Sequence, residues 1–155
     1  MIDLIEAKPL NIQDEINRIS EPTVLLNKCF FGKNSALKIQ LTKKVTETDC
    51  YIHLGSLEKE KWTWIKTKFN ELELAQVINF VKNNNPEIKS ISFFHKFNDN
   101  SQSIFINKVE KNPTEKGIIV KIKTISKFLS EAEITVMEII FRRIIELKNF
   151  RDPKY

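Results

Sequence analysis

Apolar and polar residues alternate with a period of two along most of the chain, and two segments replace this alternation with helical spacing. A period of two is typical of strands that bury one face, particularly where turn-forming residues bound the segment. The segments with this pattern are residues 23–31, 35–43, 50–54, 62–68, 90–97, 103–109 and 117–125. They fall into two groups, and we expect antiparallel strands in each group.

A helix is predicted after each group of strands. The first covers residues 71–83 and is stopped by the Asn-Asn-Asn-Pro sequence at 83–86, and the second covers residues 131–148. Apolar residues of the first helix follow the helical period at Leu74, Val77, Ile78 and Val81. The second helix is apolar on more than one side, so we expect it to be buried on more than one side.

The two helix starts are built alike. Each has a polar capping residue followed three positions later by Glu, a spacing that satisfies exposed backbone donors reciprocally. The pairs are Asn70 with Glu73 and Ser130 with Glu133. Strand-like segments precede them at 65–68 and 122–125. These similarities predict an internal repeat, in which a run of antiparallel strands and a helix occurs twice.

The predicted fold class is therefore α+β: two tandem ββββα-like repeats whose antiparallel sheets pack with two helices. Residues 1–22 form an acidic lead with a short expected helix, which Pro22 would end. Its apolar face consists of Ile12, Ile16 and Ile19. We expect residues 23–150 to form a single domain and residues 151–155 to be a tail.

Charge divides unevenly between the lead and the rest of the chain. The first 22 residues carry two basic and five acidic side chains, a net −3, which leaves +8 for the remainder of a chain whose net charge is +5. A body this basic favours a polyanionic partner such as nucleic acid. The alternative is an ordinary surface in which lysine serves solubility.

The sequence favours a cytoplasmic protein without a membrane segment. No stretch approaches the roughly 20 apolar residues of a membrane span, and the N-terminus lacks the basic start of a signal peptide. Cys29 and Cys50 have no partner at metal-binding spacing, so we expect buried free thiols in a reducing compartment.

Enzymatic signals are weak, and we expect no catalytic residues, no cofactor and no metal. His53 and His95 lie singly in strand-like segments, where a structural role is more common than a catalytic one. The three glycines are isolated and cannot build a phosphate-binding loop. A metal-dependent nuclease needs several converging carboxylates, whereas the aspartates are expected in turns or in the tail: Asp49, Asp99 and Asp152.

Binding signals are stronger and centre on one strand. Trp62, Trp64, Lys66 and Lys68 fall on one face of segment 62–68, because side chains two apart share a face. The core side of this strand is expected to hold Thr63, Ile65, Thr67 and Phe69. Exposed rings can stack on bases while lysines neutralise phosphates. The alternative is that both tryptophans are buried and the lysines border a sheet edge.

Other segments repeat this combination of polar and aromatic side chains. A polar face is predicted for Ala36, Lys38, Gln40 and Thr42, with Leu37, Ile39 and Leu41 behind it. Further candidates for contact with nucleic acid are Lys33, Phe94, Lys96, Phe105, Lys121 and Lys123. On the last helix, an oligomer interface is predicted at Met137, Ile140, Phe141 and Ile144. The alternative for that helix is burial within the chain, under the N-terminal lead.

Three patches together resemble the Whirly family of single-stranded DNA-binding proteins. Residues 32–39, Gly-Lys-Asn-Ser-Ala-Leu-Lys-Ile, are similar to the family's Lys-Gly-Lys-Ala-Ala-Leu motif, although Phe31 replaces the first Lys and one residue is inserted before Ala-Leu. Residues 92–97, Ser-Phe-Phe-His-Lys-Phe, resemble the family's Phe-Phe-His strand. Residues 62–81 resemble the strand and helix that close the first repeat. The resemblance spans about residues 23–147.

The resemblance implies largely sequence-independent binding of single-stranded DNA, in replication, repair or transcription. It also implies a homo-oligomer, with a tetramer favoured, that is held together by its helices and holds the strand between sheets of neighbouring subunits. Two alternatives stay open. One is an RNA-binding or transcription-coactivator protein of the same fold, and the other is a structural oligomerisation module that binds no nucleic acid. A nucleoid, viral or plasmid context also fits.

Overall fold

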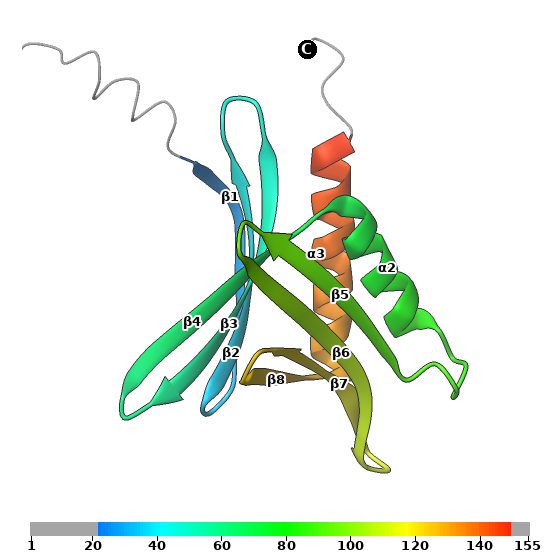
Figure 1. Ribbon diagram of the computed structural model, residues 1–155. Helices are drawn as coiled ribbons and strands as arrows, with labels where there is room; N and C mark the ends of the chain where they lie inside the picture. The colour runs from blue at the N-terminus through cyan, green and yellow to red at the C-terminus, as the bar shows by residue number, and fades with distance from the viewer. Residues whose placement is uncertain (1–21, 150–155) are drawn as a thin grey trace, which may run out of the picture.

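The computed structural model describes residues 22–149, which form eight strands and two helices (Figure 1). The first sheet, sheet A, contains β1 (Thr23–Phe31), β2 (Ser35–Lys43), β3 (Thr48–Glu58) and β4 (Lys61–Phe69), and is followed by α2 (Glu71–Lys82). The second, sheet B, contains β5 (Ser90–Phe97), β6 (Asn100–Asn112), β7 (Glu115–Ile122) and β8 (Ile125–Ser130), and is followed by α3 (Glu131–Asn149). The helix predicted near the N-terminus and the tail at 151–155 lie outside the described residues.

Each sheet is an antiparallel meander in which consecutive strands are neighbours. Strands of sheet B cross those of sheet A, and α2 lies beside α3 (Figure 1). The predicted α+β fold with two ββββα repeats is therefore confirmed.

Both helix starts have the predicted capping boxes. Backbone N of Glu73 donates to Oδ1 of Asn70 over 2.8 Å, and backbone N of Asn70 donates to Glu73 Oε1 over 3.0 Å. In α3, backbone N of Glu133 donates to Oγ of Ser130 over 3.2 Å, and backbone N of Ser130 donates to Glu133 Oε1 over 3.0 Å. These reciprocal bonds satisfy donors that a helix start leaves free, and they fix both strand-to-helix transitions.

Two strand predictions are corrected. The predicted strand over 117–125 covers most of β7, a turn in which Lys123 has a φ of 54°, and only the first residue of β8. The segment 122–125 is therefore a hairpin turn, and β8 is the true counterpart of β4 before the helix. In sheet A, β3 begins at Thr48, so Asp49 lies in a strand and is buried instead of standing in a turn.

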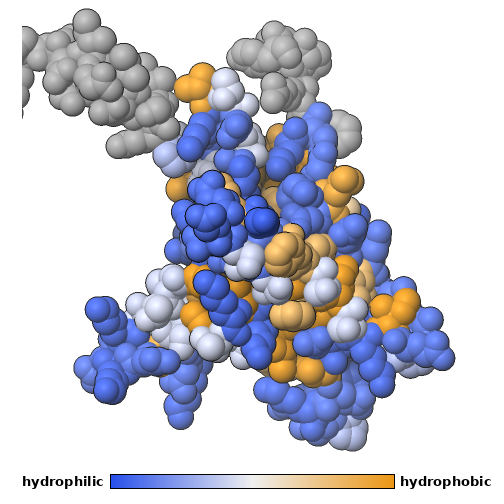
Figure 2. Space-filling view, viewed as in Figure 1, coloured by the Kyte–Doolittle hydropathy of each residue, from blue (hydrophilic) through white to orange (hydrophobic). Residues whose placement is uncertain are grey.

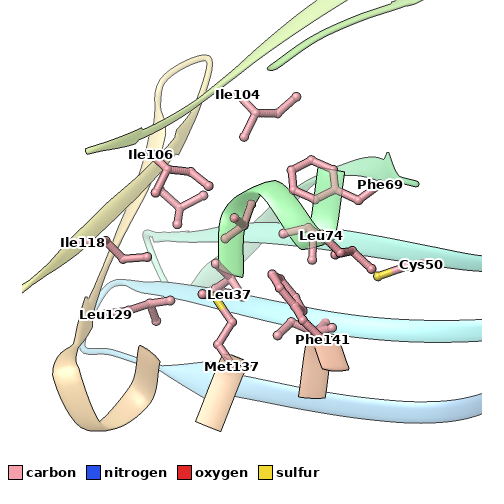
Figure 3. Packing of buried hydrophobic residues seen from close by; sticks show 14 of the residues in the cluster. Leu37, Cys50, Phe69, Leu74, Ile104, Ile106, Ile118, Leu129, Met137 and Phe141 are labelled. Atoms are coloured by element: carbon pink, nitrogen blue, oxygen red, sulfur yellow. The ribbon is translucent and has the colours of Figure 1, made fainter. Parts of the chain in front are cut away.

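The inner faces of both sheets and one side of each helix form a single hydrophobic core (Figure 3). Its fully buried side chains include Leu37, Leu54, Leu74, Ile104 and Leu129. They come from both sheets and from α2, so the two repeats share their core instead of each building a separate one. The sheets are thus fixed relative to each other, with their outer faces turned away from this core.

The interface predicted on α3 is corrected by this packing. Met137, Phe141 and Ile144 are 2%, 2% and 0% exposed and belong to the core of the same chain, and Ile140 is half-buried against it. The apolar residues that α3 exposes are Val136, Ile139 and Leu147, at 40%, 62% and 37%. The sequence could not distinguish the two apolar sides of this helix.

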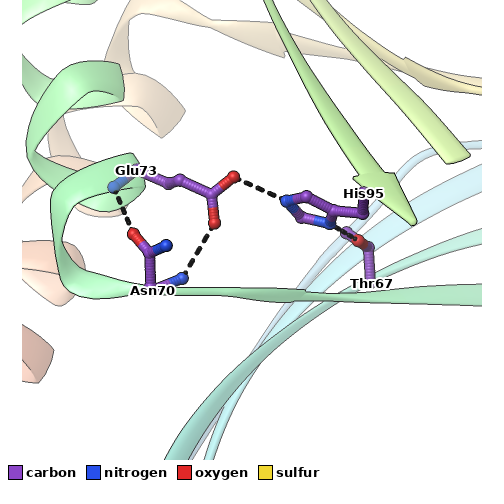
Figure 4. A network of polar contacts seen from close by, with 4 residues as sticks. All are labelled: Thr67, Asn70, Glu73 and His95. Carbon is purple, nitrogen blue, oxygen red and sulfur yellow. Dashed lines mark hydrogen bonds and ion pairs between the residues drawn. The ribbon is translucent and has the colours of Figure 1, made fainter. Parts of the chain in front are cut away.

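A polar junction joins the end of sheet A to sheet B (Figure 4). His95 of β5 has its Nδ1 2.6 Å from Oγ1 of Thr67 and its Nε2 2.5 Å from Oε2 of Glu73. Because an ionised carboxylate only accepts hydrogen bonds, Nε2 carries the proton in this pair. On β6, Gln102 Nε2 donates to the carbonyl of Lys66 over 3.3 Å. His95 therefore has a structural position, connecting β4, α2 and β5.

Candidate nucleic-acid interface

The outer face of sheet A presents its side chains in straight rows across the four strands. Strand register places Phe31, Ala36, Gly55 and Trp64 in one row. The next row contains Cys29, Lys38, His53 and Lys66, and the third contains Asn27, Gln40, Tyr51 and Lys68. Three aromatic or basic side chains of β4 thus lie on the same face as Lys38, which is two strands away.

Three aromatic side chains form a continuous cluster on this face, which we call the aromatic platform: Phe31, Trp62 and Trp64. The rings of Trp62 and Trp64 stack with centroids 5.6 Å apart and planes 22° apart, and Phe31 meets Trp62 edge-on at 5.9 Å. Phe31 and Trp64 are 65% and 38% exposed, and Trp62 is half-buried. The alternative in which both tryptophans belong to the core is wrong.

Gly55 makes room for this platform. A Cβ atom built on Gly55 would lie 2.7 Å from Cζ3 of Trp64, closer than real Cβ contacts occur. The six-membered ring of Trp64 therefore occupies the space directly over Gly55. An isolated glycine inside a strand pattern is a signal for this kind of close approach, and it could have been combined with the neighbouring tryptophans.

Lysines border the platform, but they are not equivalent. Nζ of Lys38 lies 4.9 Å from the centre of the Trp64 ring, and Nζ of Lys66 lies 5.0 Å from that of Tyr51. Lys68 instead forms an ion pair with Asp49, Nζ to Oδ1 at 3.0 Å. The hydrogen bond to Asp49 raises the pKa of Lys68. A charge already compensated in this way is less available to a phosphate than those of Lys38 and Lys66.

The polar face predicted for β2 is only partly polar and open. Ala36 is fully buried and Thr42 is 6% exposed, whereas Lys38 and Gln40 are half-exposed. Lys33 lies exposed in the turn between β1 and β2. Three members of the face, namely Phe31, Tyr51 and His53, were not predicted, although the alternation within β1 and β3 could have identified them.

His53 is electrostatically unusual. Burial, together with Lys38 and Lys66 on the two flanking strands, lowers its pKa to about 4, so the imidazole is neutral at pH 7. Its Nε2 atom is buried and has no hydrogen-bond partner among the described residues. By contrast, burial raises the pKa of the Cys50 thiol to about 12 on the core side of the same strand.

Sheet B carries a second aromatic and basic surface on its own outer face. Register places Ser92, Phe105 and Lys121 in one row, and Phe94 opposite Ser103. Phe94 and Phe105 are 66% and 44% exposed. Lys96 and Lys121 are exposed on the same face, but Lys123 lies in the β7–β8 turn and is not a strand residue as predicted. Figure 2 shows apolar residues over β5 and β6 with hydrophilic residues around them.

In sheet B, as in sheet A, an aromatic side chain of the fourth strand packs over a glycine of the third strand. A Cβ built on Gly117 would lie 2.1 Å from the backbone carbonyl oxygen of Leu129 and 2.8 Å from Cε2 of Phe128, so the neighbouring backbone excludes it as well as the ring. Nζ of Lys111 lies 3.9 Å from the centre of the Phe128 ring. In both sheets, an aromatic residue of the fourth strand therefore covers a glycine of the third. Phe128 was not predicted as a surface residue because the sequence pattern did not indicate β8 as a strand.

Two further features of the described residues concern metal ligands and a groove. Within residues 22–149, no three His, Cys, Asp or Glu side chains come together as metal ligands. A groove of about 870 Å³ lies between α2, β6, β7 and α3, and both acidic and basic side chains line it. It contains the ion pair of Lys82 with Glu138, whose charged atoms are 3.0 Å apart. Neither α2 nor α3 has the length and apolar character needed to cross a bilayer.

Comparisons with known proteins identify the fold. No protein-family model and no curated protein sequence matches the chain. Among solved structures, WHY3 from Arabidopsis thaliana superposes with a TM-score of 0.59 at 11% identity, covering 83% of this chain and 90% of that one. WHY1 from the same plant gives 0.57 at 9% identity, with 81% and 91% covered. A plant transcriptional regulator, PBF-2, gives 0.58 at 11% identity, with 81% and 91% covered. The chain therefore has a Whirly-like fold, as its sequence patches predicted.

Proposed function

We propose that this chain binds single-stranded nucleic acid, and single-stranded DNA in particular, through the outer face of sheet A. The observation that carries this proposal is the aromatic platform bordered by Lys38 and Lys66, two ammonium groups that no carboxylate within residues 22–149 pairs with. The Whirly-like fold supports it, because the family resemblance implies the same class of ligand.

Little sequence specificity is expected from this surface. Base stacking on an aromatic ring contributes about 1–3 kcal/mol per base, and every base offers a face that can stack. Lysines recognise phosphates, which carry no sequence information. A rigid sheet that presents both groups loses little entropy on binding. The proposed contacts on sheet A are Lys33, Lys38, Trp62, Trp64 and Lys66, with Lys68 weakened by Asp49.

Sheet B offers a second set of contacts at Phe94, Lys96, Phe105 and Lys121. Its exposed phenylalanines lie on a separate outer face, so one chain has two aromatic surfaces. Together they suit a protein that protects or organises exposed strands and has no catalytic step or cofactor of its own. Processes that expose single strands are replication, repair and transcription.

Assembly into a homo-oligomer is part of the proposal, with a tetramer favoured by the family resemblance. The surface that supports it is the exposed apolar side of α3, formed by Val136, Ile139 and Leu147. Apolar residues at helical spacing on an otherwise charged helix favour contact with another apolar surface. A second copy of the chain supplies one in self-complementary form.

Two alternatives differ in the ligand. An RNA-binding or transcription-coactivator role uses the same fold and the same rings, and similarity to a plant transcriptional regulator favours it in part. A purely structural oligomerisation module leaves the platform and its lysines without a role. An electrophoretic shift with single-stranded DNA, duplex DNA and RNA of equal length separates all three. The proposal requires the single-stranded DNA to shift at the lowest protein concentration, and no shift with any probe would contradict it.

A further inference from the structure

His53 occupies the centre of its row on the outer face of sheet A, directly between Lys38 on β2 and Lys66 on β4. Its buried Nε2 has no hydrogen-bond partner among the described residues. Buried polar atoms are nearly always hydrogen-bonded in native proteins, so an unpaired one calls for a partner such as a water molecule or an ion. Neighbouring strands lie about 4.8 Å apart, so both lysines can reach an anion placed over His53.

The two lysines are available for such an anion. Aromatic rings hold their ammonium groups, Trp64 for Lys38 and Tyr51 for Lys66, and no carboxylate within residues 22–149 pairs with either. Lys68 in the next row shows the contrast, because Asp49 compensates its charge at 3.0 Å. The strands on either side of the neutral imidazole therefore supply two uncompensated ammonium groups, one over the Trp64 ring and the other over the Tyr51 ring.

We propose that Lys38, His53 and Lys66 form a seat for one phosphate-type anion, and that His53 takes up a proton when the seat is filled and donates it from Nε2 in a hydrogen bond to that anion. The anion is a phosphodiester group of the bound strand, which places the seat beside the base-stacking ring of Trp64. This deepens the proposed function and rests on it for the source of the anion. Free inorganic phosphate offers the same chemistry.

The surroundings of His53 explain why binding of the anion favours protonation of the imidazole. The titratable groups around it are Lys38 on β2, Lys66 on β4, Tyr51 on its own strand and, one strand further, Cys29 on β1. In the free protein, burial first and then both lysines oppose protonation of the imidazole. A bound phosphate compensates the lysines and adds an acceptor, and both changes favour the imidazolium form.

Proton uptake makes binding depend on pH in a defined direction. Because the pKa of His53 is about 4 in the free protein and higher in the complex, affinity must increase as pH falls between the two values. One proton gives at most about a tenfold increase in affinity per pH unit. Oligothymidylate is the suitable probe, because thymine carries no group that titrates in this range.

The test follows the two histidine ring signals of the full chain by NMR during pH titrations, with His95→Gln used to assign them. Titrations are made with the protein alone, with oligothymidylate, with the same oligonucleotide on an uncharged methylphosphonate backbone, and with inorganic phosphate. We expect oligothymidylate and inorganic phosphate to raise the pKa of His53, and the uncharged oligonucleotide to leave it unchanged. Binding of oligothymidylate without a change at His53 would overturn the seat and leave the proposed function intact.

A chain that does not bind single-stranded DNA would give a different result in this titration. If oligothymidylate does not bind at all, inorganic phosphate alone decides: a raised pKa of His53 supports the seat, and an unchanged one overturns it. Variants give an independent readout where the strand binds. His53→Gln should bind it with an affinity that no longer increases at low pH, whereas the matched control His95→Gln should keep the increase. Equal pH profiles for His53→Gln and the wild type would contradict the proposal.

Discussion

Gly55 and Trp64 depend on each other on the outer face of sheet A. The ring of Trp64 fills the space that any larger residue at position 55 would occupy. It is therefore held against the sheet, with the near-parallel ring of Trp62 at a centroid distance of 5.6 Å and Lys38 beside it. A ring held in this way loses little freedom when a base stacks on it, so its binding energy is not spent on ordering the side chain.

Substitutions at Trp64 and Lys66 distinguish the contribution of base stacking to binding from that of charge attraction. Trp64→Ala should weaken single-strand binding roughly tenfold or more, since one stacked base contributes about 1–3 kcal/mol. The salt dependence should stay unchanged because no phosphate contact is lost. Lys66→Ala should instead make the logarithmic salt slope shallower by about 0.7, the value for one phosphate on a single strand.

Fluorescence anisotropy at several salt concentrations measures both effects. Intrinsic tryptophan fluorescence should be quenched by oligonucleotide and hardly changed by polyphosphate of equal charge. A folded Trp64→Ala variant with wild-type affinity would remove the platform from the binding site. Phe94 and Phe105 on sheet B would then be the next rings to test.

The lowered pKa of His53 also predicts how the stability of the free protein changes with pH. Its pKa is about 4 in the folded chain against an ordinary 6.5, so the unfolded state binds a proton first as pH falls. Stability is therefore full above about pH 6.5 and is lost progressively toward pH 4. Thermal unfolding between these values should show a smaller loss for His53→Gln than for the wild type. Parallel profiles for the two proteins would show that His53 is not the group responsible.

At the scale of elements, the two capped helices were predictable and the β7–β8 hairpin was not. The caps rest on local side-chain chemistry at Asn70 and Ser130, which a sequence displays directly. The β7–β8 turn was missed because Lys123 adopts a positive φ without being Gly or Asn. The strand-like alternation simply continues across it. Lys59 and Glu60 make the β3–β4 turn in the same unusual way, but there the flanking strands were separated enough to be recognised.

On the outer face of sheet A, too, some features were predictable from the sequence and others were not. Alternation within β4 was sufficient to place Trp64 and Lys66 on one face, whereas its exposure came from the structure. It could not show that Asp49 reaches Lys68, or that His53 lies between two lysines, because both facts depend on register between strands. Contacts within a strand follow from the sequence, whereas contacts across strands follow from pairing that single-sequence patterns do not specify.

Glu73 and Glu133 provide a matched test of the junction between the two sheets. Both close a capping box, but only Glu73 also accepts from Nε2 of His95. Gln preserves the box and removes the charge. Glu73→Gln should therefore cost on the order of 1 kcal/mol more than Glu133→Gln, the difference between a charge-assisted and a neutral hydrogen bond. Urea unfolding measures both free energies, and equal losses would show that His95 contributes nothing through this contact.

At the scale of the whole molecule, the shared core determines which surfaces are open to a partner. The two sheets and one side of each helix enclose the same buried side chains, so neither repeat can turn its inner face to a partner. The surfaces that stay available include the outer face of each sheet and the exposed side of α3. Because α3 has its own exposed apolar residues, an oligomer can form through it and leave the aromatic platform open to a strand.

Ile139 tests the oligomer without disturbing the core. It is 62% exposed, whereas Met137 on the same helix is 2% exposed. If α3 packs against a second copy, Ile139→Lys places a charge in that contact and should yield smaller species with a nearly unchanged unfolding temperature, since exposed substitutions usually change stability by less than about 0.5 kcal/mol. Met137→Lys should instead unfold the chain, because a buried unpaired charge is strongly disfavoured. Light scattering with circular dichroism distinguishes these outcomes. A monomeric wild type, or an Ile139→Lys variant of unchanged mass, would show that α3 is not the surface through which copies of this chain meet.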